Sequence, residues 1–202
     1  FNPDSDRKTF RREHDLGDNF IVLYAGAHGM SNDLDVVLEA AEHLKRNVNI
    51  RIVLLGSGKE KPHLQSLAKE KGLTNILFIP PVPKLEMPEA LAAANACLAI
   101  LKPIEMYKTT YPNKVFDYMA AGRAVILAID GVIREVVESS NAGIPIPPGD
   151  PKALSAAIED LASNPSKCQK LGENGRNAIE RHFSRDDLAE EFTALLESFE
   201  EE

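Results

Sequence analysis

The sequence predicts an α/β fold: a Rossmann-like parallel sheet of about six strands with helices on both faces. Short runs of aliphatic and β-branched residues, such as 20–25, are apolar throughout, which is typical of strands buried on both faces of a sheet. Between these runs, apolar residues recur every three or four positions, as in helices that cover a sheet. Regular alternation of the two patterns favours right-handed βαβ units and therefore a parallel sheet.

The predicted elements follow one another in a regular order. Residues 1–19 are polar, and a short helix that ends near Gly17 is expected there. After the strand at 20–25, further strands are expected at 50–55, 75–79, 96–101, 124–128 and 143–146. Helices are expected at 34–44, 61–71, 87–94, 113–121, 133–139, 151–163, 167–181 and 185–199.

Glycine, proline and short polar residues mark the ends of these elements. Gly72 and Gly122 each end a helix, and a proline at position 80 ends a strand. Asn32 and Asp33 are candidate N-caps of the helix that begins at position 34. The turn 147–150 is expected to cap the helix that begins near Pro151.

Composition bounds the class of protein. The 202 residues carry a net charge of −8, which argues against a surface built for nucleic acid. No apolar run approaches the roughly 20 residues that a membrane-spanning helix needs. Cys97 and Cys168 have no zinc-ligand spacing, and although a disulfide remains open, a reducing cytosol fits better. We therefore expect a cytoplasmic protein that binds no metal.

Parallel sheets bind ligands at the carboxyl ends of their strands, so the loops after the strands matter most. The first loop is Gly26-Ala27-His28-Gly29, and the second begins Gly56-Ser57-Gly58-Lys59. Glycines let the backbone approach a ligand closely, and helix N-termini attract anions. Neither the dinucleotide fingerprint nor a Walker motif is present. Taken alone, either loop could be a plain turn between a strand and a helix.

A third segment, 111–126, is more informative. Asn113 is expected to cap a helix whose free amides lie at the binding edge of the sheet. Lys114 adds a positive charge beside those amides, which suits a diphosphate. Asp117 lies three residues further on, on the same helix face, where its carboxylate could accept hydrogen bonds from ribose. The alternative is an ordinary amphipathic helix with a Lys114–Asp117 surface pair.

The run 112–126, PNKVFDYMAAGRAVI, resembles the signature of the retaining family 4 glycosyltransferases of GT-B fold. It is most similar to a branch related to bacterial N-acetylaminosugar transferases of surface-polysaccharide synthesis. Segments 24–29, 54–58, 75–83, 147–151 and 171–176 resemble other parts of the same family in order and spacing. The resemblance implies the C-terminal, donor-binding half of a GT-B fold, with 1–18 as interdomain linker, 19–183 as the nucleotide-sugar-binding domain and 184–202 as a C-terminal helix.

The resemblance also implies roles for individual residues. Lys114 and His28 are the candidate catalytic groups. The donor is expected to contact Gly26, His28, Gly29, Gly56, Gly58, Lys59, Val82, Asn113, Lys114, Val115 and Asp117, with Val82 at the base and Asp117 at the ribose. Many members carry a Glu-x7-Glu pair, whereas this chain has Thr109 and Asp117 at those positions. The shorter aspartate could still reach ribose, but Thr109 supplies no carboxylate near the donor sugar.

The expected activity is transfer of a sugar from a nucleotide sugar, UDP-sugar by the resemblance, with retention of configuration and without a cofactor. The acceptor is expected to bind an N-terminal domain that is missing here, so the fragment alone should be inactive. A peripheral association of the full-length enzyme with the inner membrane face stays open. Alternatives are a nucleotide-sugar-binding module and a GT-B epimerase or phosphorylase domain. The lack of an early acidic cluster and of a flavin loop argues against a flavodoxin-like receiver or cofactor domain.

Overall fold

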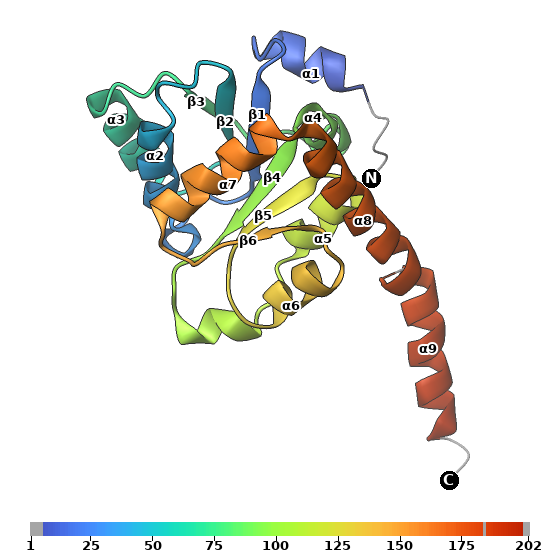
Figure 1. The fold of residues 1–202 in the computed structure, drawn as a ribbon. Coiled ribbons are helices and arrows are strands. Elements are labelled where there is room, and N and C mark those ends of the chain that lie inside the picture. Colours follow the sequence, from blue (N-terminus) through green and yellow to red (C-terminus); the bar gives the residue numbers. More distant parts are fainter. Residues whose placement is uncertain (1–5, 184, 200–202) are drawn as a thin grey trace.

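The computed structural model describes residues 6–183 and 185–199, and its centre is a six-stranded parallel sheet in the order β3-β2-β1-β4-β5-β6 (Figure 1). The strands are β1 (Phe20–Ala25), β2 (Ile50–Leu55), β3 (Ile76–Ile79), β4 (Ala96–Ile100), β5 (Ala124–Ala128) and β6 (Gly143–Pro145). The predicted α/β, Rossmann-like class is confirmed. The expected linker start 1–5, Ser184 and the acidic end 200–202 lie outside the described residues.

All six strands are parallel, but the order in which the chain adds them to the sheet reverses between β1 and β4. The chain moves outward from β1 to β3, then returns to the other side of β1 and continues to β6. This is the order of dinucleotide-binding folds and differs from the flavodoxin-like order. Ligands of such sheets bind at the carboxyl ends of the strands that flank the reversal. The loops that follow β1 and β4 are therefore the first place to look for a site.

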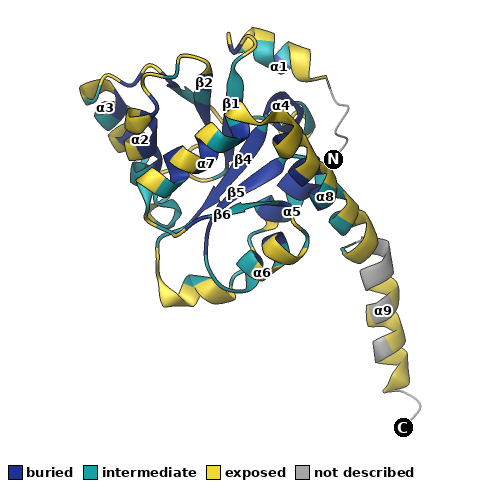
Figure 2. Ribbon diagram, in the orientation of Figure 1, coloured by how far each residue is buried: buried dark blue, intermediate teal, exposed yellow. Residues whose placement is uncertain are grey.

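Helices cover the sheet in two layers, and the four inner strands β2, β1, β4 and β5 are almost wholly buried between them, whereas the outer strands β3 and β6 are mostly half-buried (Figure 2). On one face lie α2 (Leu34–His43), α3 (Lys61–Glu70) and α7 (Pro151–Ser163). On the other lie α1 (Arg7–Glu13), α4 (Met87–Ala93), α5 (Asn113–Ala120) and α6 (Val132–Ser139). Successive residues of β1 alternate between the two layers: Val22 and Tyr24 enter the first core, and Leu23 enters the second.

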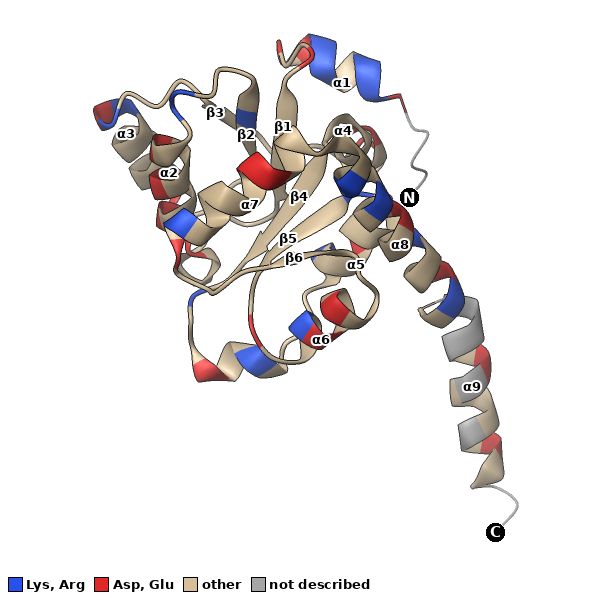
Figure 3. Ribbon diagram, viewed as in Figure 1, with Lys and Arg blue, Asp and Glu red and all other residues tan. Residues whose placement is uncertain are grey.

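Charge is almost excluded from the sheet, as Figure 3 shows. Arg51 in β2 is the one charged residue in the six strands. Acidic and basic side chains instead lie on the helices and loops, where water solvates them. Two-sided burial explains why each strand reads as a continuous apolar run rather than as an alternating one.

Helix α8 (Pro165–His182) passes from one layer to the other. Its early residues Cys168 and Leu171 belong to the first core, whereas Ala178 and Ile179 contact the second. Helix α9 (Arg185–Ser198) follows and projects away from the sheet (Figure 1). None of the described helices is both long enough and apolar enough to span a bilayer.

Residues 6–18, which the sequence assigned to a linker, pack on the domain in this structure. Phe10 of α1 is buried in the second core. Arg11 donates from Nη2 to the side-chain oxygen of Asn95 at 2.8 Å and from Nε to the carbonyl of Ala93 at 2.9 Å. The segment is thus attached to the amino edge of β4 and to the end of α4. The helix ends at Glu13, before the expected end near Gly17.

Several boundaries and caps differ from the sequence prediction. Strand β3 begins at Ile76, one residue later than expected, and Asn75 before it is buried, with its side-chain amide donating to the carbonyl of Ala41. Asp150 caps α7, as expected, by accepting from the amides of Lys152 and Ala153. Of the two expected N-caps of α2, Asp33 holds the N-cap position, in a left-handed conformation, but no side chain caps this helix. The side-chain amide of Asn32 donates to the carbonyl of Ala27 instead.

Two short 3-10 helices lie within predicted loops. The first, η1 (Met30–Asn32), follows the first glycine loop, and the second, η2 (Glu105–Thr109), lies between β4 and α5. Cys97 and Cys168 are both buried and free. Burial raises the pKa of both thiols, that of Cys168 to about 11. The apolar surroundings therefore keep both cysteines as neutral thiols at neutral pH.

Candidate donor-phosphate site

The first and second glycine loops contact each other at the carboxyl edge of the sheet. The amide of Gly26 donates to the carbonyl of Leu55 at 3.0 Å, at the ends of β1 and β2. Beyond the strands, His28 is bonded on both sides of its backbone: its amide donates to Ser57 at 2.8 Å, and its carbonyl accepts from Glu60 at 3.0 Å. The two loops are therefore bonded to each other through their backbones.

The glycines of the second loop are required by this contact. A Cβ at Gly56 would lie 1.9 Å from the carbonyl oxygen of Gly26, and Gly56 also has a φ of +145°. A Cβ at Gly58 would lie 2.4 Å from the carbonyl oxygen of His28. Both positions exclude any side chain because the first loop occupies the space. Their expected contact with a donor stays a prediction, since packing of the loops by itself explains the two glycines.

Lys114 brings an ammonium group to the first glycine loop. Its Nζ lies 4.1 Å from the centre of the Tyr24 ring, a cation–π contact. A Cβ at Gly26 would approach the same nitrogen to 2.7 Å, so the bare glycine leaves room for the ammonium. None of the ion pairs among the described residues includes Lys114. Burial lowers the pKa of Lys114 to about 8, which still leaves the side chain charged at neutral pH.

Tyr118 fixes the start of α5 relative to the end of β1. Its hydroxyl accepts from the amide of Ala25 at 3.0 Å and donates to the carbonyl of Ala25 at 3.2 Å. The side chain is buried, and burial raises the pKa of the phenol well above its usual value, so it stays neutral. Because Lys114 is one turn before Tyr118 on the same helix, this bond holds the lysine over Tyr24. Lys114 and His28 thus share the carboxyl edge of the sheet.

The His28 side chain is enclosed by the protein. Its exposure is 0%, and neither ring nitrogen has a hydrogen-bond partner among the described residues. The rings of Tyr24 and Phe78 lie with their centroids 6.1 and 6.4 Å away. Burial, with smaller effects of Lys61 and Lys114, lowers the pKa of His28 to about 4, so the ring is neutral. Its expected catalytic role stays a prediction, and it needs the ring or the loop to move toward a ligand.

The remaining predicted residues are spread along the same edge. Asn113 does not cap α5, which corrects the sequence prediction: Pro112 holds the N-cap position because its backbone is extended (φ −67°, ψ 118°), and no side chain caps the helix. The first amides of a helix have no partner within it, so the uncapped start of α5 keeps donors for an anion. Val115 is buried.

Other predicted contacts differ in exposure. Asp117 and Val82 are half-buried, and Lys59 is exposed. Gly29 has an ordinary φ of −107°, and a Cβ there would meet its nearest neighbour at 3.6 Å. Thr109 donates from its hydroxyl to the carbonyl of Met106, so it is occupied within η2. The structure therefore gathers Gly26, His28 and Lys114 around Tyr24, and it leaves the contacts of the other residues as predictions.

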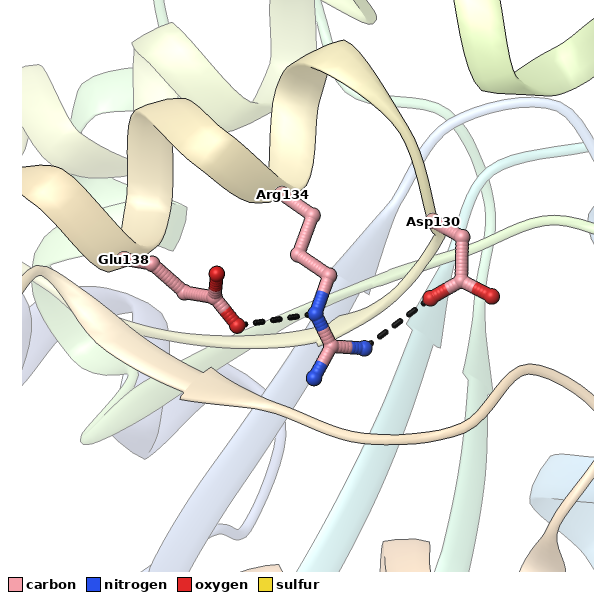
Figure 4. Close-up of polar contacts among 3 residues, drawn as sticks. All are labelled: Asp130, Arg134 and Glu138. Carbon is pink, nitrogen blue, oxygen red and sulfur yellow. Dashed lines mark hydrogen bonds and ion pairs between the residues drawn. The ribbon is translucent and has the colours of Figure 1, made fainter.

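The loops after β4 and β5 extend this edge. Arg134 of α6 lies between two carboxylates, with Nη1 2.9 Å from Asp130 and Nε 2.8 Å from Glu138 (Figure 4). Asp130 belongs to the loop after β5, so the arginine attaches that loop to α6. A Cβ at Gly131 would lie 2.0 Å from the carbonyl oxygen of Lys108, which places the loop directly against η2. A cavity of about 150 Å³ opens between these loops.

A larger cavity, of about 1200 Å³, lies at the opposite edge of the sheet, beside Phe20, Ile50 and Arg123. Size does not make it the better candidate, because Lys114 and the glycine loops lie at the carboxyl edge, where parallel sheets bind ligands. Among the residues that the structure describes, no group of three or more His, Cys, Asp or Glu side chains could hold a metal ion. The expectation of a metal-independent site remains untested.

Sequence reasoning missed three residues of this arrangement. Tyr24 was placed in the first strand and in the segment 24–29 that resembles the family, and Tyr118 in the family signature, but neither was given a role. Lys61 was placed at the end of the second glycine loop and the start of a helix, also without a role, yet its ammonium donates to the carbonyls of Gly56 at 2.7 Å and Ile79 at 3.1 Å. A tyrosine, with its polar hydroxyl, near the end of an otherwise apolar strand is a usable signal for Tyr24. No local signal identifies Lys61, because one of its acceptors lies on another strand.

Comparison with known proteins agrees with this architecture. The family model described as "Glycosyl transferases group 1" matches residues 6–178. The O-antigen chain mannosyltransferase C of Escherichia coli is 26% identical over 200 residues, which cover 96% of this chain and 52% of that protein. The chain spans about half the length of the curated relatives that it matches over most of its length.

Two solved structures show the same fold. The Anabaena protein Alr3699/HepE, in complex with UDP and glucose, superposes with a TM-score of 0.84 at 18% identity, over 98% of this chain and 55% of that one. The C-terminal domain of the group 1 glycosyl transferase LpcC from Francisella tularensis superposes with a TM-score of 0.78 at 19% identity, over 92% and 96% of the two chains. The matched model covers most of the sequence, and the chain therefore belongs to the glycosyl transferases group 1 family.

Proposed function

We propose that this chain is the donor-binding half of a retaining family 4 glycosyltransferase and that it binds the diphosphate of a UDP-sugar at the carboxyl edge of its sheet. The ammonium of Lys114 carries the proposal. It lies over Tyr24 and beside Gly26, next to the reversal in strand order, and no carboxylate forms an ion pair with it among the described residues.

A partly buried cation of this kind is stabilised by a bound anion. Removing an ammonium from water costs free energy that the ring of Tyr24 offsets only in part. The uncapped start of α5 adds backbone amides beside it. Cation and amides together suit a diphosphate better than a neutral ligand. The Anabaena relative of the same fold was solved with UDP and glucose, which supports UDP as the nucleotide.

The same groups account for a transferase mechanism. Negative charge builds on the nucleoside diphosphate as the bond to the sugar breaks. Lys114 and the α5 amides are already oriented toward that charge and need no rearrangement during the reaction. Asp117, one turn after Lys114, is the proposed acceptor of ribose hydroxyl bonds. Transfer to a sugar acceptor, of N-acetylhexosaminyl or other hexosyl type, then needs an acceptor-binding domain outside this chain. The cytoplasm is the proposed location because it holds the nucleotide sugars.

A panel of donors tests the function. The chain is titrated with UDP-, GDP-, ADP- and dTDP-sugars, and the midpoint of thermal unfolding is measured in each case. A ligand at 100 times its dissociation constant stabilises the folded state by about 2.7 kcal/mol, so a bound donor raises the midpoint by several degrees. UDP-sugars are expected to give the largest rise. The absence of a rise with every nucleotide sugar would refute the donor-binding function.

The alternative function is a nucleotide-sugar-binding domain without transferase activity, or a GT-B epimerase or phosphorylase domain. The donor panel does not separate these from a transferase, but the product does. Full-length protein that transfers the sugar to an acceptor without consuming inorganic phosphate excludes all three. Binding without any turnover would favour the binding domain.

A further inference from the structure

Lys61 joins the carboxyl ends of two neighbouring strands. It is the first residue of α3, and its ammonium donates to the carbonyl of Gly56 at 2.7 Å and to that of Ile79 at 3.1 Å. Gly56 follows β2 directly, and Ile79 ends β3. The backbone already joins these ends, since the amide of Gly56 donates to the carbonyl of Ile79 at 3.0 Å, and the lysine adds a second, side-chain link at the same place.

The ammonium of Lys61 resembles that of Lys114 in having no acidic partner. None of the ion pairs found among the described residues contains Lys61, and both of its acceptors are neutral carbonyls. The residue is half-buried, and burial lowers the pKa of its side chain. A partly desolvated cation without a counter-ion costs folding free energy, which is a reason to look for what it does in a ligand complex.

Contacts lead from Lys61 to the first glycine loop without interruption. Lys61 binds the carbonyl of Gly56. The Cα of the same glycine packs so closely on the first loop that a Cβ there would lie 1.9 Å from the Gly26 carbonyl oxygen. Ser57 and Glu60, on either side of Lys59, bond the amide and the carbonyl of His28. A shift of the second loop would therefore displace His28 and, with it, the turn at Gly26 that lies beside Lys114.

Both ammonium groups act on the first loop electrostatically. After burial, Lys61 and Lys114 are the further causes that lower the pKa of His28. The neutral histidine leaves the two positive charges undiminished. Two such charges match a ligand that carries more than one negative charge, as a diphosphate does.

We propose that Lys61 is a positioning residue of the diphosphate site: its ammonium holds the second glycine loop against the first, so that the first loop faces the diphosphate that Lys114 contacts. This inference rests on the proposed function, because it names the group that shapes the same site. It goes beyond the proposed function in the role that it gives to the second loop. Lys61 acts on the backbone of that loop and does not contact the base or the sugar.

Calorimetric titration of UDP and of uridine into the chain tests the proposal. In Lys61→Met, the affinity for UDP is expected to fall about tenfold, the size of one charge-assisted contact, while the affinity for uridine changes by less than about twofold. Lys61→Arg keeps the charge and the donors, and it is expected to bind UDP within about threefold of the wild type.

The matched control is Lys45→Met. Lys45 follows α2 and also donates its ammonium to a backbone carbonyl, that of Lys71, but it is exposed and away from the glycine loops. Its loss is expected to leave both affinities unchanged. Hydrogen exchange gives a second measurement: the amides of His28 and Glu60 should exchange faster in Lys61→Met, and at the wild-type rate in Lys45→Met.

The outcomes separate this proposal from the function on which it rests. A wild-type chain that binds no UDP refutes the diphosphate site and the role of Lys61 together. A wild-type chain that binds UDP, with Lys61→Met either unchanged or weakened equally for UDP and uridine, overturns only the role of Lys61. If Lys61→Met does not fold, Lys61→Gln replaces it under the same criteria, because the glutamine NH₂ group keeps N–H donors for the carbonyls without the charge.

Discussion

The ammonium of Lys114 lies 4.1 Å from the centre of the Tyr24 ring, above the end of the central strand β1. Helix α5 supplies the lysine and β1 the tyrosine, and 90 residues separate them in the sequence. The Tyr118 hydroxyl bonds to Ala25 hold the two elements in this relation. The contact brings an ammonium group to a glycine-rich turn that could otherwise have been an ordinary βα connection, and this charge is what the proposed site depends on.

Replacing the lysine tests that charge directly. In Lys114→Met, UDP binding is expected to weaken by about 1.5–3 kcal/mol, or roughly 10- to 150-fold, because a charge-assisted hydrogen bond to the diphosphate is lost. Uridine binding should change little. Isothermal titration calorimetry measures both, and Lys170→Met, an exposed lysine of α8, serves as control. Equal losses for UDP and uridine would contradict the phosphate role.

The pH dependence of binding should follow the same side chain. Lys114 is charged below a pKa of about 8, so UDP affinity is expected to hold at pH 7 and to fall as the pH rises above 8. Bound UDP favours the ammonium and moves the fall to higher pH. Titrations at pH 7, 8, 9 and 10 measure the profile. Lys114→Met should lose the fall that begins near pH 8 and keep only the decline that deprotonation of the uracil ring causes at higher pH. A wild-type profile identical to that of Lys114→Met would speak against the assignment.

The free energy of unfolding of the ligand-free chain should rise with pH over the range in which the affinity for UDP falls. The folded pKa of about 8 lies below the ordinary value of 10.5, so between these values the unfolded chain binds more protons than the folded one at this group. The contribution of Lys114 to the free energy of unfolding therefore rises with pH from 8 to 10.5. Urea unfolding of wild type and of Lys114→Met, compared at pH 7.5 and 10, isolates it. A difference between the two proteins that does not change with pH would exclude the lowered pKa.

The glycines of the two loops should separate folding from binding. Gly56→Ala is expected to cost about 3 kcal/mol or more, because φ is +145° and the new Cβ would lie 1.9 Å from the Gly26 oxygen. Gly29→Ala has room for its Cβ and should change the free energy of unfolding by less than about 1 kcal/mol. If the Gly29 backbone approaches the diphosphate, Gly29→Ala should nevertheless weaken UDP binding. Urea unfolding and calorimetry on both variants measure the two effects.

The hydroxyl that joins α5 to β1 should also be measurable. Tyr118→Phe leaves the ring in place but removes the partner of the buried Ala25 amide, which is expected to cost about 1–3 kcal/mol of stability. The exposed Tyr111 provides the control, since Tyr111→Phe should change stability by less than about 0.5 kcal/mol. A Tyr118→Phe variant as stable as the control would show that the bond does not hold α5.

Sequence patterns predicted the elements well because each pattern reports burial within one element. The apolar run of β5 could only be a strand covered on both faces, and Ala124–Ala128 is indeed one. Asp150 was expected as a cap from its place before Pro151, and its side chain bonds two amides of α7. The cap expected from Asn113 failed because Pro112 precedes it, and the extended backbone of that proline takes the N-cap position. Local rules compete at such positions, and the conformation of one neighbour decides between them.

By itself the sequence determined the α/β class, the places of the strands and helices, and the resemblance that led to the glycosyl transferases group 1 family, because period and local composition encode them. Only the tertiary structure decided that His28 is enclosed and unpaired, that Gly56 and Gly58 are shaped by the first loop, and that Lys61 binds the Gly56 and Ile79 carbonyls at the ends of β2 and β3. These are contacts between segments that the strand order brings together. The distances in these contacts depend on how closely the backbones of separate loops approach at the edge of the sheet. The sequence of a single segment does not determine that approach.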